Sequence, residues 1–457
     1  MSTPDCIRRD FLKAGGLTGL AVGLNTFSPA MFHRRVLAAP NLSKKKLIFI
    51  FQRGGNDGVN TVIPRGDPEY NSIHRPTLFI DPAEALDLGN GFAQLHPQMQ
   101  SMLDLYNHTS LTGIAGPGNL AVLHRIGYSG QSQSHFDSQQ YWENGLPGQP
   151  HKEEGMIYRQ VAKTLDPTNN HFVAASLSTS QMVALKGSLP LPTLSDPATF
   201  KFSGNANRVS KFLGSLPSAP SGPDGKGFLG LYGGPRDFPQ KPYRDTVYST
   251  GVVLAEAVQV VQSAVGGGPY TPANGAVYPT GDFGNKLTSV AMLLKRTPVQ
   301  VLGVNIGGWD THTDQGSING SHGNLLRAVA DGFKALYLDL QEQWQDLVIV
   351  TMTEFGRTSI ENDSLGTDHA YACVSFVAGG GVRGGVYNCG PDTWAPGDLF
   401  SQDSRYVRHR TDYRAVFAEI FMKHFGDNQA LLNEVSPGYE AAAAANPGDF
   451  QFLNFMA

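Results

Sequence analysis

The sequence predicts an α/β protein with a mostly parallel central sheet and helices on both faces. Three consecutive segments of the last third support this: an apolar run at 298–308, leucines at helical spacing across 322–344, and a β-branched run at 347–352. Strand, helix, strand in this order is a βαβ unit, so its two strands run parallel and end at the same edge. The unbroken apolar run at 347–352 is typical of a strand that is buried on both faces.

The other elements are predicted from hydrophobic periodicity and from residues that begin or end helices. The predicted strands are 46–52, 120–126 and 372–381, and the predicted helices are 93–106, one that begins at Ser134, 245–264 and 412–426. Ser134 suits an N-cap, with Asp137 three residues later as in an acidic capping box. Gly- and Pro-rich stretches at 203–244 and 266–281 are predicted to be long surface excursions from one domain over 40–457.

The first 39 residues have the features of an export signal. Arg8 and Arg9, in the string IRRDFLK, precede a short, weakly apolar stretch, and Val-Leu-Ala-Ala follows at 36–39. The arginine pair resembles the twin-arginine signal, which directs folded proteins across the inner membrane. We therefore expect a periplasmic or secreted protein that meets the twin-arginine translocase during export. The alternative is a basic N-terminal tail.

Composition excludes some classes of protein. The chain has 35 Lys and Arg against 39 Asp and Glu, a formal net charge of −4, and a nucleic-acid binder would normally carry a basic face. No stretch of the mature chain is long and apolar enough to span a bilayer. Beyond the signal two cysteines remain, Cys373 and Cys389, and the sequence is compatible with a disulfide or with two buried free thiols.

Acidic and histidine side chains follow the predicted strands at their carboxyl ends, where α/β sheets open onto a ligand crevice. Carboxylate oxygens and imidazole nitrogens are ligands for divalent zinc, manganese or iron, so we expect a divalent metal ion there. The candidate ligands are Asp57, Asp310, His312, Glu354, Asp368 and His369. Structural roles are the alternative: Asp57 and Asp368 could cap turns, and Glu354 could form a buried ion pair with Arg357.

Candidate residues for substrate binding and catalysis lie near the same strand ends. Arginine presents a planar, permanently charged fork to an oxyanion, so Arg53 and Arg357 are candidate substrate-binding residues, together with Asn60 in the first glycine-rich loop. A serine at a helix N-terminus faces partial positive charge, so Ser134 is a candidate nucleophile toward a phosphate- or sulfate-like group, with His135 beside it. The spacing favours the alternative that Ser134 only caps its helix.

Several motifs resemble a known family. FQRGGNDGVNTVIP, SQSHFDSQQYWENG, GGWDTHTDQ, VTMTEFGRT and GTDHA, with the RRDFLK leader, are similar to segments of the bacterial secreted proteins grouped as domain-of-unknown-function family 1501. The resemblance extends from the leader to the C-terminal helix. That family is similar to the alkaline phosphatase and sulfatase superfamily, which implies an alkaline-phosphatase-like α/β fold.

The resemblance also implies roles for individual residues. Asp57 matches the first-strand metal aspartate, Asp310 and His312 resemble the acid and histidine of one metal, and His369 resembles the late histidine ligand. Where phosphatases have Asp-His after the strand, this chain has Glu354 and a phenylalanine, so one ligand is changed and one is missing. The resemblance therefore implies the fold more firmly than it implies hydrolysis.

The leading hypothesis is an exported metal-dependent hydrolase of phosphate or sulfate esters, with a small-molecule or polymer substrate. Ser134 or an activated water would attack, and Arg53 or Arg357 would neutralise the oxyanion. The alternative is a non-catalytic exported binding or assembly protein that retains the fold, which the change at Glu354 suggests. A redox enzyme loaded with cofactor before export is a third hypothesis, but the chain has no cysteine cluster and no haem-attachment motif.

Overall fold

The computed structural model describes residues 44–108, 118–150, 152, 154–165, 167, 170–204, 206–214, 227–233 and 244–457. The predicted export signal lies outside these residues. The chain divides into two compact units, of which one contains Lys201–Val260 and the other contains Asn41–Phe200 and Val261–Ala457. The second unit holds the central sheet and all the candidate site residues.

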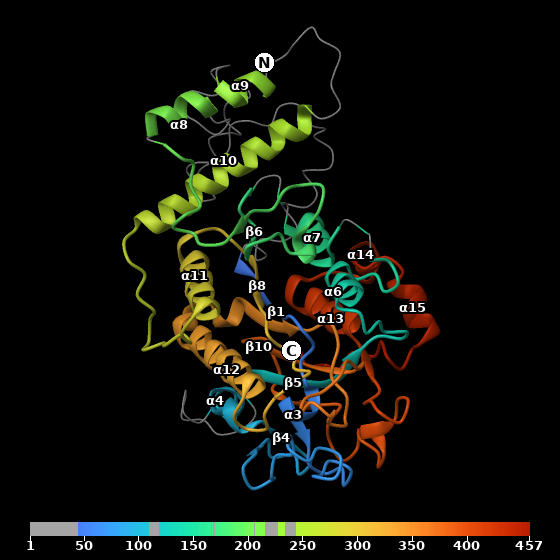
Figure 1. Cartoon of the computed structure of the whole chain (residues 1–457). Helices are drawn as coiled ribbons and strands as arrows, with labels where there is room; N and C mark the ends of the chain where they lie inside the picture. Colours follow the sequence, from blue (N-terminus) through green and yellow to red (C-terminus); the bar gives the residue numbers. More distant parts are fainter. Residues whose placement is uncertain are drawn as a thin grey trace. The chain divides into compact units, whose positions relative to one another are not determined.

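The central sheet has nine strands within the described residues, in the order β11-β5-β10-β9-β1-β8-β6-β7, with β12 also paired to β5 (Figure 1). All pairings are parallel except those of β10, which runs antiparallel to β9 and to β5. The mostly parallel sheet confirms the predicted fold class. Its strands are β1 (Lys46–Gln52), β5 (Leu120–Gly127), β6 (Ala174–Leu177), β7 (Thr193–Leu194), β8 (Val301–Ile306), β9 (Leu347–Met352), β10 (Cys373–Gly379), β11 (Gly385–Tyr387) and β12 (Thr411–Asp412).

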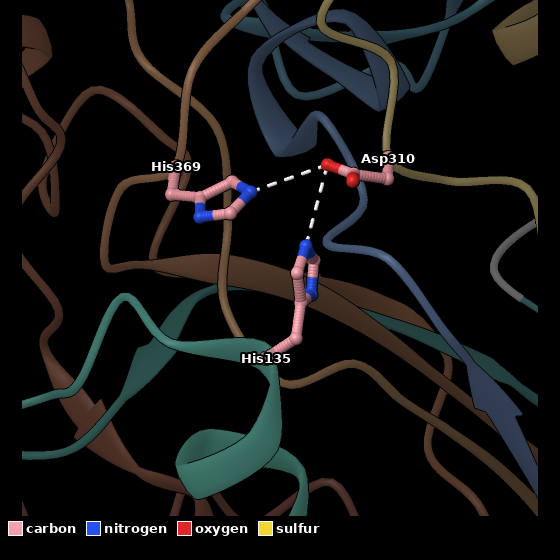
Figure 2. Close-up of side chains that lie close together, drawn as sticks. All are labelled: His135, Asp310 and His369. Carbon is pink, nitrogen blue, oxygen red and sulfur yellow. Dashed lines mark hydrogen bonds and ion pairs between the residues drawn. The ribbon is translucent and has the colours of Figure 1, made fainter.

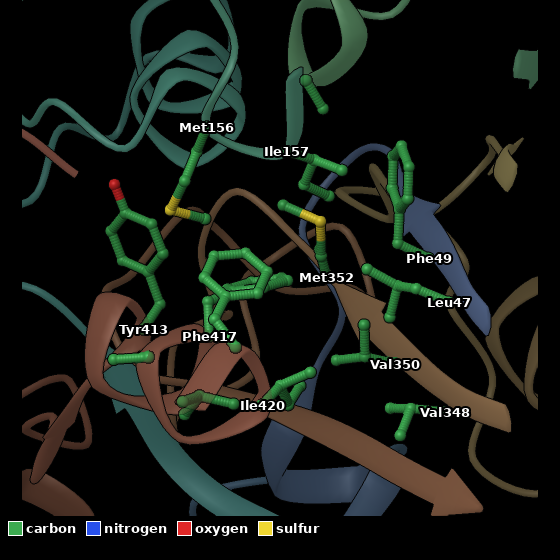
Figure 3. Packing of buried hydrophobic residues seen from close by; sticks show 14 of the residues in the cluster. Leu47, Phe49, Met156, Ile157, Val348, Val350, Met352, Tyr413, Phe417 and Ile420 are labelled. Atoms are coloured by element: carbon green, nitrogen blue, oxygen red, sulfur yellow. The ribbon is translucent and has the colours of Figure 1, made fainter. Parts of the chain in front are cut away.

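Helices cover both faces of this sheet. On one face, Leu47 and Phe49 of β1 and Val350 of β9 pack in a buried cluster with α7 (Met156–Gln160) and α13 (Tyr413–Phe425) (Figure 3). Because successive side chains of a strand point to opposite faces, the alternate residues of β1 face the other layer. That layer contains α4 (Gln100–Asn107), α11 (Asp282–Arg296) and α12 (Ser321–Asp339) (Figure 1).

The predicted helix at 93–106 is wrong in its first part. Residues Ala93–Leu95 form strand β4, which pairs with β2 (Val62–Pro64) and β3 (Leu86–Asp87) in a small antiparallel sheet. Pro97 explains the difference, because a residue that precedes proline is kept extended, and His96 has a ψ of 140°. A 3-10 turn follows, and the helix itself begins at Gln100.

The other predicted helices are confirmed with shifted ends. The 322–344 helix ends at Asp339 and continues as a 3-10 segment, and the excursion at 203–244 contains two short helices. The remaining helices are α3 (Gly58–Thr61), α6 (His135–Asn144), α8 (Ala206–Leu213), α9 (Gly227–Gly233), α10 (Arg244–Gly266), α14 (Gln429–Val435) and α15 (Tyr439–Ala445). The short 3-10 or π segments are η2 (Pro97–Met99), η3 (Val161–Leu165), η4 (Val183–Leu185), η5 (Gln341–Asp346) and η6 (Asp398–Phe400).

Cys373 and Cys389 are buried free thiols and do not form the disulfide that the sequence also allowed. Burial raises the pKa of both Cys373 and Cys389, which keeps these thiols protonated and unreactive. Among the described residues, no helix has the length and apolar character needed to cross a membrane.

Candidate functional site

The loops that follow β1, β8 and β9 are bound to one another at the carboxyl edge of the sheet. The backbone N–H of Gly54 donates to Glu354 Oε1 at 2.8 Å, and the N–H of Trp309 donates to the carbonyl of Arg53 at 3.3 Å. Gly54 has a φ of +126°, and a Cβ there would lie 2.4 Å from the backbone nitrogen of Asp310. Only glycine permits this approach. The first loop thus turns sharply against the other two.

Three imidazoles converge on a single carboxylate oxygen at this edge, Asp310 Oδ1. Figure 2 shows two of them, those of His135 and His369. The Nε2 atoms of His312, His369 and His135 lie 3.1, 3.2 and 3.3 Å from that oxygen. The ligand atoms of His135, Asp310 and His369 all lie within 4.8 Å of one another. In addition, Nε2 of His312 is 2.9 Å from Nε2 of His369. We call these four residues the histidine–aspartate cluster.

The other ring nitrogen of each imidazole is held by an oxygen. The contacts, each made by Nδ1, are His135 with Glu354 Oε1 at 2.8 Å, His312 with Asp368 Oδ1 at 3.1 Å, and His369 with the carbonyl oxygen of Gln133 at 2.7 Å. Because these oxygens accept, Nδ1 carries the proton of a neutral ring and Nε2 presents its lone pair. In the neutral form of each ring, a lone pair of Nε2 therefore faces Asp310 Oδ1, whereas a protonated ring donates to that oxygen.

The charges of the cluster favour a bound cation. Partial burial acts to raise the pKa of Asp310, but the hydrogen bond and charge of Arg357 outweigh it, so the pKa is lowered and the carboxylate is ionised. Burial lowers the pKa of His369, which leaves its ring neutral near pH 7. A hydrogen bond to Glu354 raises the pKa of His135, whose buried Nε2 has no hydrogen-bond partner within the described residues. Imidazole nitrogens with a carboxylate oxygen are a donor set that suits zinc or a similar ion.

Two of the predicted residues, Asp57 and Asn60, are bound by groups other than the cluster. Asp57 is completely buried, where it caps α3 and forms an ion pair with Arg75 at 2.6 Å. Its Oδ2 also accepts from Gln315 Nε2 at 2.7 Å, so both carboxylate oxygens are occupied. The side chain of Asn60 is buried as well, where it donates to the Leu78 carbonyl at 2.8 Å. Neither side chain reaches the surface at which a substrate would bind.

Glu354 and Asp368 contact the cluster through its histidines. Glu354 is completely buried, and its Oε1 accepts from His135, Gly54 and Gln139. Burial acts to raise the pKa of Glu354, but its hydrogen bonds, first that of His135, outweigh burial and lower it. The same balance, with hydrogen bonds from Asn362 and His312, lowers the pKa of Asp368. Both carboxylates are thus positioned to orient imidazoles.

The two arginines differ in exposure. The guanidinium of Arg357 is completely buried, where it donates to Asp310 Oδ1 and to the backbone carbonyls of Gly55 and Thr367 at 3.0 and 2.8 Å. It connects the strand-end loops from within the protein. The side chain of Arg53 is 23% exposed and donates to Asn305, Gln139 and Glu143.

Ser134 directly precedes α6, in the position of the N-cap. Its hydroxyl makes no capping hydrogen bond to the helix, and its backbone N–H donates to Ser132 Oγ at 3.1 Å. The side chain is half-buried. The helix therefore does not use this hydroxyl, which stays available for another role beside His135.

Sequence reasoning missed three residues that bind the predicted site residues. Gln139 donates to Glu354 Oε1 at 2.8 Å and accepts from Arg53 Nη1 at 2.9 Å. It lies four residues after His135 in α6, so helical spacing could have identified it. Gln133 contributes only a backbone carbonyl, and Arg75 reaches Asp57 from a separate loop. For these two the sequence holds no local signal.

Two solved structures illustrate the distant similarities. One is the crystal structure of the lipoteichoic acid synthase LtaP from Listeria monocytogenes, 9% identical with a TM-score of 0.26, for which 73% of this chain and 65% of that chain are covered. The other is the C-terminal periplasmic domain of EcEptC from Escherichia coli in complex with Zn, 8% identical with a TM-score of 0.27 and coverages of 80% and 79%. At these TM-scores the alkaline-phosphatase-like fold stays a prediction.

A comparison with curated proteins found no match. The family comparison did find one, over the part of the chain that contributes Asp310, His312, Glu354 and His369. Residues 255–432 match the model of the family described as protein of unknown function (DUF1501), and the motifs GGWDTHTDQ, VTMTEFGRT and GTDHA lie within that span.

Proposed function

We propose that the protein is an exported metal-dependent hydrolase of phosphate or sulfate esters. The observation that supports the proposal most is the convergence of three imidazole nitrogens on Asp310 Oδ1, with one of these nitrogens buried and without a hydrogen bond among the described residues. Neutral imidazoles that present their Nε2 lone pairs to one carboxylate oxygen favour a cation among them, in addition to Arg357, which pairs with Asp310 from the buried side. Export is proposed from the twin-arginine leader, and the translocase would be the partner at that step.

The four residues of the histidine–aspartate cluster would hold the metal ion. A bound divalent ion supplies a Lewis acid for an ester oxygen and lowers the pKa of water. Glu354, Asp368 and the Gln133 carbonyl keep the three imidazoles in the tautomer that presents Nε2. Arg357 neutralises part of the charge of Asp310 from the buried side.

Hydrolysis of such an ester breaks the bond between phosphorus or sulfur and the alcohol oxygen. The oxygen of water takes the place of the alcohol, either directly or after Ser134 Oγ has held the phosphoryl or sulfuryl group, and the alcohol leaves with a proton from water. Ser134 suits the second route because its hydroxyl is half-buried, is not used as a helix cap and lies at a helix N-terminus, which favours an anionic group. Arg53, which is partly exposed, is the candidate for binding the oxyanion.

The test combines metal analysis with turnover. We expect the purified protein to hold about one equivalent of zinc or a similar ion, and a His369→Ala variant to lose that metal together with hydrolysis of p-nitrophenyl phosphate or sulfate. The matched control is His74→Ala, which removes a histidine that packs against Phe400 outside the cluster. Metal-free wild-type protein, or a His369→Ala variant with unchanged turnover, would contradict the proposal.

A non-catalytic binding or assembly protein is the second candidate. The ion pair of Arg357 with Asp310 favours it, because a carboxylate that is already neutralised inside the protein has less need of a metal ion. Measured hydrolysis of any phosphate or sulfate ester that disappears in the His369→Ala variant would exclude this candidate.

A further inference from the structure

A polar hollow of about 490 Å³ lies beside the cluster, at the carboxyl ends of three neighbouring strands. Its volume is within the range of roughly 300–1,000 Å³ that is typical of small-molecule sites. β1, β6 and β8 each contribute the residues at or just after their ends, and the first turns of α11 close the hollow. Its principal polar side chains are those of Arg53, Ser178, Ser180, Asp282, Lys286 and Asn305.

The hollow and the cluster share parts of the protein. Gly307 lines the hollow, and Asp310 follows it three residues later in the same loop. A chain of hydrogen bonds also joins them: Arg53 donates to Gln139 at 2.9 Å, and Gln139 donates to Glu354 at 2.8 Å. Glu354 in turn holds His135 at 2.8 Å. A molecule that reacts at the cluster therefore has this hollow as its neighbouring surface.

The wall of the hollow is polar, and both of its cations are paired. Arg53 pairs with Glu143 at 2.7 Å, and Lys286 pairs with Asp282 at 2.6 Å, so each cation already has a carboxylate partner. Away from Arg53, the candidate for the oxyanion of the ester, a second anionic group at this wall would have to compete with Asp282 for Lys286. Between the pairs lie hydroxyl groups and the amide of Asn305, whose Nδ2 donates to Ser178 Oγ at 3.1 Å.

Such a surface suits a group with many hydroxyls. Guanidinium, carboxylate and amide groups each offer two adjacent polar atoms, which match pairs of neighbouring hydroxyls that both donate and accept. We propose that the hollow binds the alcohol part of the ester substrate, and that this part is an uncharged, polyhydroxylated group such as a sugar ring. The inference rests on the proposed function, which it extends from the ester bond to the class of alcohol.

The experiment compares two kinds of ester in the metal-loaded full chain. D-glucose 6-phosphate and D-glucose 6-sulfate carry the polyhydroxylated group, and phenyl phosphate and phenyl sulfate lack it. In a Lys286→Met variant we expect kcat/KM for the glucose esters to fall about tenfold, because one hydrogen bond from a charged group is lost. For the phenyl esters, kcat/KM should stay within about twofold of the wild-type value. The matched control is Lys334→Met, which removes a lysine paired with Asp104 away from the hollow.

A second variant covers the case in which Lys286→Met fails to fold. Ser180 is exposed, so the Ser180→Ala substitution leaves the core intact. We expect it to lower kcat/KM for the glucose esters and not for the phenyl esters, by a smaller factor than Lys286→Met does. Equal losses on both kinds of ester, or no loss on the glucose esters in either variant, would overturn the inference.

Binding separates this inference from the proposed function. If neither kind of ester is hydrolysed, the proposed function fails. Saturation-transfer NMR with D-glucose then tests whether the hollow binds a polyhydroxylated group. Transfer to glucose in wild type that is lost in the Ser180→Ala variant supports a polyhydroxyl site. Absence of transfer in wild type, or displacement of glucose by inorganic phosphate alone, would overturn the assignment to an uncharged group.

Discussion

Asp57 and Asp310 both follow a strand of the central sheet and both pair with an arginine, yet their surroundings differ. The carboxylate of Asp57 is completely buried, and its two oxygens accept from Arg75, from Gln315 and from backbone amides. The side chain of Asp310 is 47% exposed. It shares one oxygen between Arg357 and three imidazole nitrogens.

The difference distinguishes a carboxylate whose oxygens are fully bonded inside the protein from one that is exposed enough to take a further partner. The side chains that hydrogen-bond to Asp57, those of Arg75 and Gln315, are both donors, so its carboxylate oxygens are satisfied inside the protein. The neighbours of Asp310 include, beside the donor Arg357, imidazole nitrogens that present lone pairs in the neutral ring. A carboxylate at a strand end is therefore a candidate ligand only where acceptors, and not donors alone, surround it.

The largest expected effect is on the free energy of unfolding when the ion pair of Asp57 with Arg75 is broken. Replacing Arg75 by methionine leaves a buried carboxylate without its partner, which costs about 3–5 kcal/mol of the free energy of unfolding. Urea titration of wild type and Arg75→Met measures it. The paired variant Asp57→Asn/Arg75→Met should recover part of the loss, because it removes the uncompensated charge. A loss below about 1 kcal/mol in the single variant would show that the pair is not structural.

The pH dependence of stability gives the next largest effect. Burial acts to raise the pKa of Asp57, but the charge and hydrogen bonds of Arg75 outweigh it and lower the pKa from the ordinary 3.8 to about 2. A carboxylate with a lowered folded-state pKa contributes stability above about pH 4 and loses it as the pH falls toward 2. The contribution is about 2 kcal/mol.

Comparison with Asp57→Asn isolates this contribution from that of other carboxylates. The free energy of unfolding of wild type should fall more steeply than that of the variant between about pH 4 and pH 2, and the two slopes should agree above pH 5. Parallel curves throughout would mean that Asp57 has an ordinary pKa, contrary to the ion pair described above.

Local patterns suffice to predict the strands β1, β5, β8, β9 and β10 and the polar loops that follow β1, β8 and β9, but not the short strands β6, β7, β11 and β12. The strand 46–52 agrees with β1 at both ends, and the βαβ order places the loops of Asp310 and Glu354 at one edge. Which donor or acceptor each side chain meets at that edge is decided by packing between distant segments. Arg75 comes from a loop with no periodicity, so the sequence holds no sign that it would neutralise Asp57.

The partners of His135 are also decided by packing between distant segments. Its position beside a helix N-terminus suggests a catalytic role near Ser134, but its orientation depends on how α6 packs against the ends of β1 and β9. Glu354 holds its Nδ1, so its Nε2 turns toward Asp310. Only the three-dimensional arrangement reveals that His135 belongs with His312 and His369.

The smallest expected effect concerns Asp368, which orients His312 from a partly exposed position. Asp368→Asn keeps an oxygen that can accept from Nδ1 but removes the charge, so the metal affinity should fall by about tenfold, the low end of the range for such outer partners. Competition with a chromophoric chelator measures it. The matched control is Asp363→Asn, an exposed acid in the same loop. Equal affinities of Asp368→Asn and wild type would mean that the charge of Asp368 does not support His312, whereas a loss as large as that of His369→Ala would make Asp368 itself a ligand.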